Sequence, residues 1–190
     1  MKYLFLLIGA PGSGKTTDAD IIANNDPKNI AHFSTGELLR DEVKSGSKLG
    51  KIIDKKISKG NLVPVEIAVQ TITKAINSSD KKIILIDGFP RSVEQMMGLE
   101  RELIKNSDIR LTLVFEIVVS EETAKQRVLG RNRGADDKEE IFSNRMKIYS
   151  EPLELIQDFY NSKNILVKID GEREAETIAQ EIKSAIYARV

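Results

Sequence analysis

The chain has 190 residues, of which 41% are hydrophobic and 31% are charged, and its 29 basic residues balance its 29 acidic residues. This size indicates a single domain, 1–190, and the zero net charge argues against a nucleic-acid-binding protein that works by bulk charge. The sequence contains no cysteine, which excludes a disulfide framework and a cysteine-ligated zinc site.

An apolar run from Tyr3 to Ile8 opens the chain and favours a β-strand. Lys2 before this run gives it some likeness to a signal peptide. The run is shorter than the roughly 7–15 apolar residues of a signal-peptide core, and it passes directly into a glycine-rich loop. No segment reaches the ~20 apolar residues that a membrane span needs. We therefore expect a mature N-terminal strand and a cytoplasmic protein.

Apolar strands alternate with helical segments along the rest of the chain. Ser34-Thr35-Gly36-Glu37 has the form of a capping box that opens a helix, and Pro64 opens another helix. Pro152 is expected to kink or divide the helical segment between residues 137 and 160. The alternation predicts an α/β fold, with a parallel sheet covered by helices on both faces. Five strands are expected, at about 3–8, 29–33, 82–87, 111–118 and 165–169.

A phosphate-binding motif follows the first strand. Residues Gly9 to Thr16 match G-x-x-x-x-G-K-[ST] at each fixed position, and a helical segment from Thr17 to Ala23 comes next. Glycines let backbone amides approach a phosphate, and a helix N-terminus attracts the anion. Lys15 is therefore expected to reach the β- and γ-phosphates of a nucleotide, and the Thr16 hydroxyl to face Mg²⁺. The alternative is a glycine-rich turn that binds nothing.

Other polar residues fall where predicted strands end. Ligands of parallel sheets bind at this edge, and Ser34, Asp87 and Gly171 lie there with the phosphate loop. Asp87 is expected to help to hold Mg²⁺ or its waters, although an aspartate before Gly88 is also typical of a turn. The single histidine, His32, lies within a strand and is expected to pack or to form hydrogen bonds rather than to catalyse.

Several arginines are candidates for the same site, and two of them, Arg40 and Arg91, follow strand ends and could reach this edge. A solvated surface charge is the ordinary explanation of any one arginine. A set of them beside a phosphate loop suits a reaction between two polyanions, because guanidinium groups offset the repulsion between phosphates. A phosphate acceptor has a second pKa of about 6, so it is ionised near pH 7 and needs no strong general base. The arginines concerned are Arg40, Arg91, Arg127, Arg131, Arg133 and Arg145.

Several alternative classes lack their motifs in this chain. The guanine-specificity motif N-K-x-D does not occur, and Asp87-Gly88-Phe89-Pro90 does not match D-x-x-G, which argues against a GTPase. No second acid follows Asp87, which argues against an ATPase that polarises water with paired carboxylates. No aromatic-basic cluster indicates stacking on nucleic acid.

Taken together, these motifs resemble those of the adenylate kinase family, in the family's order and along nearly the whole chain. The resemblance implies a P-loop nucleoside monophosphate kinase-like three-layer fold, with a core of residues 1–33, 64–127 and 137–190. It further implies an AMP-binding flap of residues 34–63 and a short lid of residues 128–136. The similar segments are Gly9–Thr16, His32–Arg40, Lys59–Pro64, Asp87–Arg91 with Gln95, and Arg127–Arg131 followed by Asp136, Asp137 and Arg145.

The resemblance also implies an activity: reversible, Mg²⁺-dependent phosphoryl transfer from ATP to AMP, giving two ADP and maintaining adenine nucleotide balance. The implied ATP-binding residues are Gly12, Ser13, Gly14, Lys15, Thr16, Thr17, Arg127, Arg131, Gly171 and Arg173. The implied AMP-binding residues are Thr35, Arg40, Asn61, Leu62, Val63, Gly88, Phe89, Pro90, Arg91, Gln95, Arg133 and Arg145. Of these, Gln95 would read the adenine edge. The implied catalytic residues are Lys15, Arg91, Arg127, Arg133 and Arg145, with Thr16 and Asp87 holding Mg²⁺ largely through water.

The chain departs from the family pattern at the lid. The family usually shows R-x-D-D there, whereas here Gly134 stands at the arginine position and Arg133 comes one residue earlier. The segment from Arg131 to Asp136 is too short for a zinc-ribbon lid, so we expect the short-lid form without zinc.

Two rival functions remain open from the sequence. The first is a UMP or CMP kinase, against which Thr35 and Gln95 argue by resemblance. The second is a nucleotide-binding regulator without turnover, which would have little use for arginines aimed at a transfer site. We expect neither nucleic acid nor membrane as a partner. No feature demands an assembly, so we expect a monomer.

Overall fold

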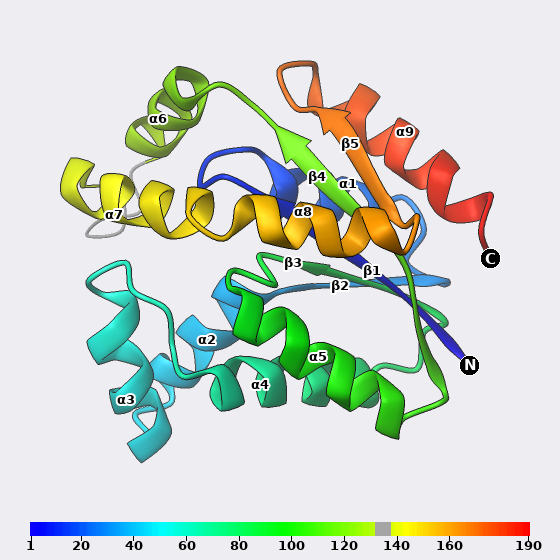
Figure 1. Ribbon diagram of the computed structural model, residues 1–190, viewed down its shortest axis with the longest axis horizontal. Coiled ribbons are helices and arrows are strands. Elements are labelled where there is room, and N and C mark those ends of the chain that lie inside the picture. Colours follow the sequence, from blue (N-terminus) through cyan, green and yellow to red (C-terminus); the bar gives the residue numbers. More distant parts are fainter. Residues whose placement is uncertain (132–137) are drawn as a thin grey trace.

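The computed structural model describes residues 1–131 and 138–190 and centres on a five-stranded parallel sheet (Figure 1). The strand order is β2-β3-β1-β4-β5. Each predicted strand is present within two residues of its expected ends, and the α/β fold is confirmed. The strands are β1 (Lys2–Gly9), β2 (Ile30–Ser34), β3 (Ile83–Asp87), β4 (Ile109–Val118) and β5 (Leu166–Asp170).

Helices cover both faces of the sheet, which makes three layers (Figure 1). The helices α1 and α9 pack on one face, and α4, α5 and α8 pack on the other. The helices α2 and α3 lie beside α4, and α6 and α7 lie over the phosphate loop. Their bounds are α1 (Lys15–Asn24), α2 (Thr35–Lys44), α3 (Lys48–Ile57), α4 (Val65–Ser78), α5 (Val93–Lys105), α6 (Glu121–Gly130), α7 (Glu139–Ser150), α8 (Leu153–Ser162) and α9 (Ala175–Tyr187).

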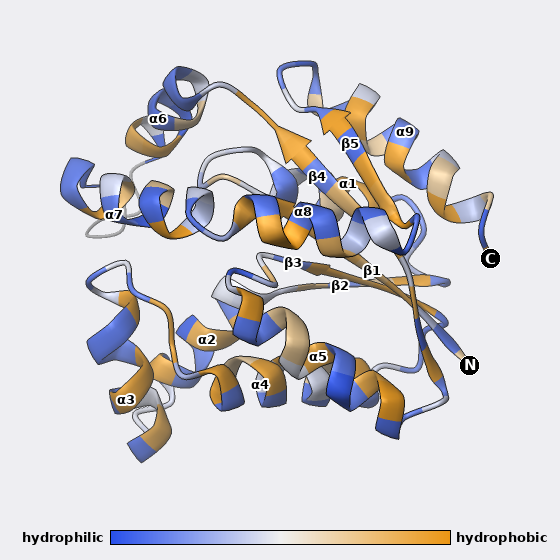
Figure 2. Ribbon diagram, in the orientation of Figure 1, coloured by the Kyte–Doolittle hydropathy of each residue, from blue (hydrophilic) through white to orange (hydrophobic). Residues whose placement is uncertain are grey.

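The central strand β1 explains why the sheet is buried on both faces. Leu4 and Leu6 pack against α4, α5 and α8, while Phe5 and Leu7 pack against α1 and α9. All four side chains are fully buried, so each contributes about 1.5–3 kcal/mol of hydrophobic stabilisation. Both sides of the strand need apolar residues, which is why the run is continuous rather than alternating. Figure 2 shows the same apolar character along the strands.

The strand register brings distant polar residues to one edge. Leu7 of β1 pairs with Asp87 of β3, and Ser34 of β2 pairs with Asp87 from the other side. Gly9, at the start of the phosphate loop, pairs with Ile117 of β4. The carboxyl ends of β1, β2, β3 and β4 therefore open on the same edge, where the loops that follow them meet.

Two local predictions have different outcomes. Pro152 divides the predicted helix, because α7 ends at Ser150 and α8 begins at Leu153. The predicted capping box correctly places the start of α2, since Ser34 is its N-cap residue. The predicted hydrogen bond is wrong, because the Ser34 side chain does not cap the helix. The Ser34 hydroxyl instead lies 3.4 Å from Oδ1 of Asp87, to which it donates. The strand register places that carboxylate beside the hydroxyl, and the tertiary contact replaces the local one.

The predicted lid and its flanking acids are only partly described. Residues 128–130 form the end of α6 and Arg131 is its C-cap residue, whereas Arg133, Gly134, Asp136 and Asp137 lie outside the described residues. Among the helices that the structure describes, none is both long enough and apolar enough to span a bilayer.

Candidate active site

The phosphate loop joins β1 to α1 and depends on glycine. Gly12 has a φ of +84°, and a Cβ at this position would lie 2.3 Å from the carbonyl oxygen of Ala124. Gly14 has a φ of +97° and is the N-cap residue of α1, with no side-chain cap. The amide groups of the first turn of α1 are therefore left for an anion.

Lys15 lies at the centre of a group of positive charges. Its Nζ donates to the carbonyl oxygen of Ala10 at 3.0 Å. Burial lowers the pKa of Lys15 to about 7; Arg91, Arg145 and Arg131 add to this lowering, and the Asp87 carboxylate opposes it. This concentration of cations is costly unless negative charge offsets it, which is the electrostatic signature of a polyphosphate site.

Asp87 is held by side chains from two other elements, α1 and β2. Its Oδ2 lies 2.7 Å from Nε2 of His32, and its Oδ1 accepts from the Thr16 hydroxyl at 3.1 Å. The other ring nitrogen of His32, Nδ1, lies 2.8 Å from Oδ1 of Asp20 on α1. The expectation that His32 forms hydrogen bonds is confirmed.

These contacts set the charge of both buried groups. Burial alone lowers the pKa of His32, but hydrogen bonds and charge from Asp87 and Asp20 outweigh it, so the pKa is above its ordinary value. Burial alone raises the pKa of Asp87, but His32, Lys15 and Thr16 together bring it below its ordinary value. Asp87 is therefore a carboxylate at neutral pH.

The oxygen atoms of Thr16 and Asp87 suit a Mg²⁺ ion. Magnesium prefers oxygen ligands and keeps several waters, so it is usually held by one or two carboxylates together with substrate phosphates. A carboxylate and a hydroxyl 3.1 Å apart, beside the phosphate loop, match this preference. Within residues 1–131 and 138–190, no three His, Cys, Asp or Glu side chains form a cluster that would hold a metal by themselves.

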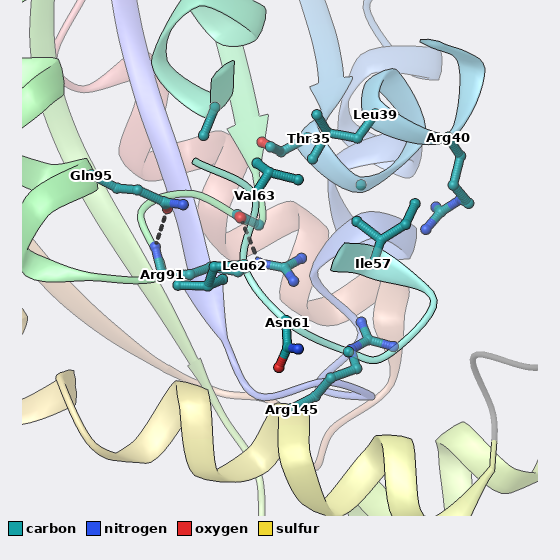
Figure 3. A pocket seen from close by; sticks show the side chains of 14 residues that line it. Thr35, Leu39, Arg40, Ile57, Asn61, Leu62, Val63, Arg91, Gln95 and Arg145 are labelled. Carbon is teal, nitrogen blue, oxygen red and sulfur yellow. Dashed lines mark hydrogen bonds between the residues drawn. The ribbon is translucent and has the colours of Figure 1, made fainter. Parts of the chain in front are cut away.

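A first pocket lies between helices α2 and α3 and the end of β3 (Figure 3). Its wall combines apolar side chains, which can cover a flat ring such as a nucleobase, with polar and charged groups that can orient a ligand. The apolar part comes from Leu39, Ile57, Val63 and Ala68. The polar part comes from Thr35, Gln95 and Asn61, together with Arg40, Arg91 and Arg145.

Two buried polar groups point to a ligand in this pocket. Thr35 is 5% exposed, and its Oγ1 has no hydrogen-bond partner among the described residues. Gln95 is 3% exposed, and its Oε1 accepts from the backbone amide of Arg91 at 2.8 Å. This bond orients the Gln95 side chain and leaves its amide nitrogen to donate toward the pocket (Figure 3). A hydroxyl and an amide donor in an apolar pocket can read the edge of a base.

A second pocket joins the first one to the phosphate loop. It is lined by Gly9, Pro11 and Lys15 from the loop and by Ile148 and Tyr149 from α7. The two pockets share Gly60, Leu62, Gly88, Arg91 and Arg145. Arg91 is held in place by its Nε, which donates to the carbonyl oxygen of Gly88 at 2.8 Å. A continuous path therefore runs from Gln95 to Lys15, with two guanidinium groups along it.

A groove on the opposite side of Lys15 is lined by Gly12, Gly14, Thr16, Thr17, Arg127 and Arg131. Arg127 extends from α6 into this groove. Its Nη1 donates to the carbonyl oxygen of Ser13 at 3.3 Å and to that of Gly171 at 3.1 Å. Arg127 thus connects the phosphate loop to the end of β5. Lys15 lines both this groove and the second pocket, so it lies between two ligand-sized spaces.

Comparisons with known proteins show the family to which the chain belongs. The family model described as adenylate kinase matches residues 7–165. The adenylate kinase of Campylobacter fetus subsp. fetus is 62% identical over 186 residues, covering 98% of this chain and 97% of the relative. That of Nitratiruptor sp. is 58% identical over 190 residues, covering 100% and 98%. That of Wolinella succinogenes is 59% identical over 190 residues and covers both chains completely.

The chain belongs to the adenylate kinase family. The family assignment made from the sequence is confirmed, and the chain's length suits the short-lid form. Its activity is that of an adenylate kinase, a nucleoside monophosphate kinase. The full sequence contains no cysteine for the zinc site of a long lid.

Most site residues expected of an adenylate kinase lie together in the structure. Nine of the twelve expected AMP-binding residues line the first pocket, and Pro90 lines the second. Phe89 is fully buried in the core instead, and Arg133 lies outside the described residues. On the ATP side Ser13 is fully buried within the loop, and Arg173 pairs with Glu181 of α9 at 2.5 Å.

Sequence reasoning missed Asp18 and Asp20, both on α1. Asp18 is 2% exposed, and its Oδ2 has no hydrogen-bond partner within the described part of the chain. Burial raises the pKa of Asp18 to about 6, although Arg127 and Lys15 act in the opposite direction. Asp20 holds His32, a contact between residues 12 apart. An acid on a helix after a phosphate loop is ordinary in sequence, so neither carries a signal that could have singled it out.

Proposed function

We propose that this chain transfers the γ-phosphoryl group of ATP to AMP, with ATP in the groove beside the phosphate loop and AMP in the first pocket. The observation that carries this proposal is the path of shared pocket residues between Gln95 and Lys15, with Lys15 also lining the groove beyond. Two nucleotides placed in these spaces meet with their phosphates at Lys15.

The proposed AMP site reads the base and neutralises the phosphate. Gln95 and Thr35 face the adenine, while the apolar wall covers its ring. Arg91 and Arg145 lie between the two pockets and would bind the phosphate, and Arg40 would bind it from the flap. Guanidinium groups suit this task because each binds two phosphate oxygens at once. Phe89, Leu62 and Val63 would contribute through backbone and packing.

The proposed ATP site uses backbone amides, Lys15 and two arginines. The amides of residues 12–17 would bind the β- and γ-phosphates, with Lys15 on the transferring group. Arg127 and Arg131 line the groove, and Gly171 is joined to Arg127. Thr16 and Asp87 would hold Mg²⁺, largely through water, and the ion would supply positive charge to the ATP phosphates when bound.

The reaction needs alignment and charge screening more than proton transfer. A bond forms from an AMP phosphate oxygen to the γ-phosphorus as the bond from that phosphorus to the ADP oxygen breaks, so both products are ADP. The acceptor oxygen is already ionised, and no general base is required. Lys15, Arg91, Arg127 and Arg145 would stabilise the charge on the transferring group, with Arg133 as a further candidate outside the described residues.

We also propose the division into a core, an AMP-binding flap of residues 34–63 and a short lid of residues 128–136. Closure of the flap and the lid would exclude water, which otherwise competes with AMP for the phosphoryl group. A monomeric state and a cytoplasmic location remain predictions. Sedimentation of the purified protein tests the former.

A coupled assay tests the proposed function. Purified protein with MgATP is expected to form ADP when AMP is added, and to do so far more slowly with UMP or CMP. Faster formation of ADP with UMP or CMP than with AMP would show a pyrimidine nucleotide kinase. Nucleotide binding without any turnover would show a regulator, and either result would overturn the proposal.

A further inference from the structure

The turn at the end of the proposed AMP-binding flap is bonded to helix α7. This turn, Lys59–Asn61, is called the flap turn below. The side-chain nitrogen Nδ2 of Asn144 on α7 donates to the carbonyl oxygen of Lys59 at 2.9 Å and to Oδ1 of Asn61 at 3.0 Å. One amide group therefore joins two atoms of the flap turn that lie 85 and 83 residues away in the sequence.

The flap turn also approaches α7 closely at its middle residue. Gly60 has a φ of +72°, and a Cβ there would lie 3.2 Å from Cγ of Arg145 and from Cγ2 of Ile141. It would lie 3.3 Å from the carbonyl oxygen of Ile141. Both the positive φ and the lack of space favour glycine, so the turn is shaped to rest on this helix.

This contact lies where the two pockets join. Gly60 and Arg145 line both pockets, and Asn61 lines the first. In Figure 3 the Asn61 side chain points down toward the helix that carries Arg145. The groove on the ATP side contains no residue of the flap turn. A change in the contact should therefore act on the acceptor side of the site.

We propose that Asn144 is a positioning residue that holds the flap turn against α7 and thereby sets the affinity for the nucleoside monophosphate. The inference rests on the proposed function in one respect: the first pocket must be the acceptor site. Asn144 lines neither pocket and acts through Asn61 and Arg145. Without its two bonds the flap turn separates from Arg145 more often, and the pocket is complete for a smaller fraction of the time.

Isosteric replacement separates this role from simple packing. Asn144→Asp keeps the shape of the side chain but replaces the donor by an oxygen that faces two acceptors. Asn144→Asp and Asn144→Ala are both expected to raise KM for AMP roughly tenfold, because two partly solvent-exposed hydrogen bonds are lost. KM for ATP and kcat at saturating AMP are expected to stay within about twofold.

Three further variants sharpen the test. Ser143→Ala, at the neighbouring exposed position of α7, is the matched control and is expected to behave as wild type. Asn61→Ala removes one of the two bonds, so it is expected to have the smaller effect and to be non-additive with Asn144→Ala. Gly60→Ala adds a Cβ that would push the flap turn away from α7. This variant is also expected to raise KM for AMP.

A distance measurement gives a readout that does not depend on turnover. The chain has no cysteine, so spin labels can be placed at Lys51→Cys on α3 and Glu154→Cys on α8, both exposed positions. Without nucleotide, Asn144→Asp is expected to shift the distance distribution between the labels toward longer values. Ser143→Ala is expected to leave it unchanged. Circular dichroism and thermal unfolding confirm that each variant is folded.

The proposal is overturned if Asn144→Asp matches Ser143→Ala in KM for AMP or in the distance distribution. It is equally overturned if KM for ATP rises together with KM for AMP, since the residue would then support the whole site. If wild type shows no AMP-dependent ADP formation, the proposed function fails instead. The distance distributions then decide alone whether Asn144 holds the flap turn.

Discussion

His32 and Asp87 form a buried pair, with Nε2 of the ring 2.7 Å from Oδ2 of the carboxylate. Asp20 extends the pair from the opposite ring nitrogen. The pair joins β2 to β3 at the edge where the phosphate loop lies, so it fixes the direction of the carboxylate that would serve Mg²⁺. Its two members lie 55 residues apart in the sequence.

Loss of His32 is expected to reduce stability in a pH-dependent way. In the protein without metal or nucleotide, His32→Ala should lower the free energy of unfolding by about 1–3 kcal/mol, because Asp87 loses a charged partner while it stays buried. The pKa of His32 is raised on folding, so this stabilisation is complete below the ordinary value of about 6.5. It is lost as pH rises through the folded-state pKa.

Urea unfolding of wild type and His32→Ala between pH 6 and pH 9 measures this difference. We expect the difference in the free energy of unfolding between the two proteins to become smaller as pH rises. A gap that is constant, or that widens with pH, would show that His32 is not charged in the folded protein.

Lys15 is expected to couple ATP binding to proton uptake. The pKa of Lys15 is lowered to about 7, so at pH 8 most molecules of the free protein carry it neutral. Bound phosphates favour the ammonium form and raise this pKa, so MgATP should bind with uptake of up to about one proton and should bind more weakly as pH rises from 6.5 to 8.5.

Calorimetry at pH 8 in two buffers of different ionisation enthalpy measures the uptake. Lys15→Met is the control, and it is expected to abolish most of the uptake. If wild type and Lys15→Met exchange the same number of protons, Lys15 is not the group that titrates.

Gln95 is expected to determine the preference for adenine. Gln95→Glu keeps the oxygen that accepts from the Arg91 amide and replaces the amide donor that faces the pocket. A site built to hydrogen-bond its substrate loses at least about 1–3 kcal/mol when a partner is left unpaired, so KM for AMP should rise roughly tenfold or more. KM for ATP should not change. Initial rates with AMP, UMP and CMP measure the effect. An unchanged preference for AMP would show that Gln95 does not contact the adenine.

Gly12→Ala is expected to damage nucleotide binding through backbone geometry alone. The added Cβ meets the carbonyl oxygen of Ala124 at 2.3 Å, and the φ of +84° disfavours any side chain. The phosphate loop must shift, so ATP affinity should fall by at least about tenfold, with a strain of roughly 1–3 kcal/mol. Titration with ATP measures the loss. Gly46→Ala is the control, because its φ is also positive but no atom lies within 4 Å.

The sequence by itself determined the parts of this protein whose physics is local. The apolar runs of β1 and β3 could be read because both faces of each strand are buried. The phosphate loop could be read because the two fixed glycines of the motif, Gly9 and Gly14, both have positive φ values that glycine adopts most readily. Pro152 divided its helix for an equally local reason, since its ring removes a hydrogen-bond donor.

Only the tertiary structure decided the long-range contacts. The sequence pattern predicts that the Ser34 hydroxyl caps its own helix, α2. In the structure it does not cap the helix and instead donates to Asp87, because the strand register brings the two residues together. The same holds for Asp20 with His32, and for Asn144 with the flap turn. Asp, His and Asn are common polar residues that satisfy their hydrogen bonds with whatever partner folding supplies, so their roles depend on the packing of elements far apart in the chain.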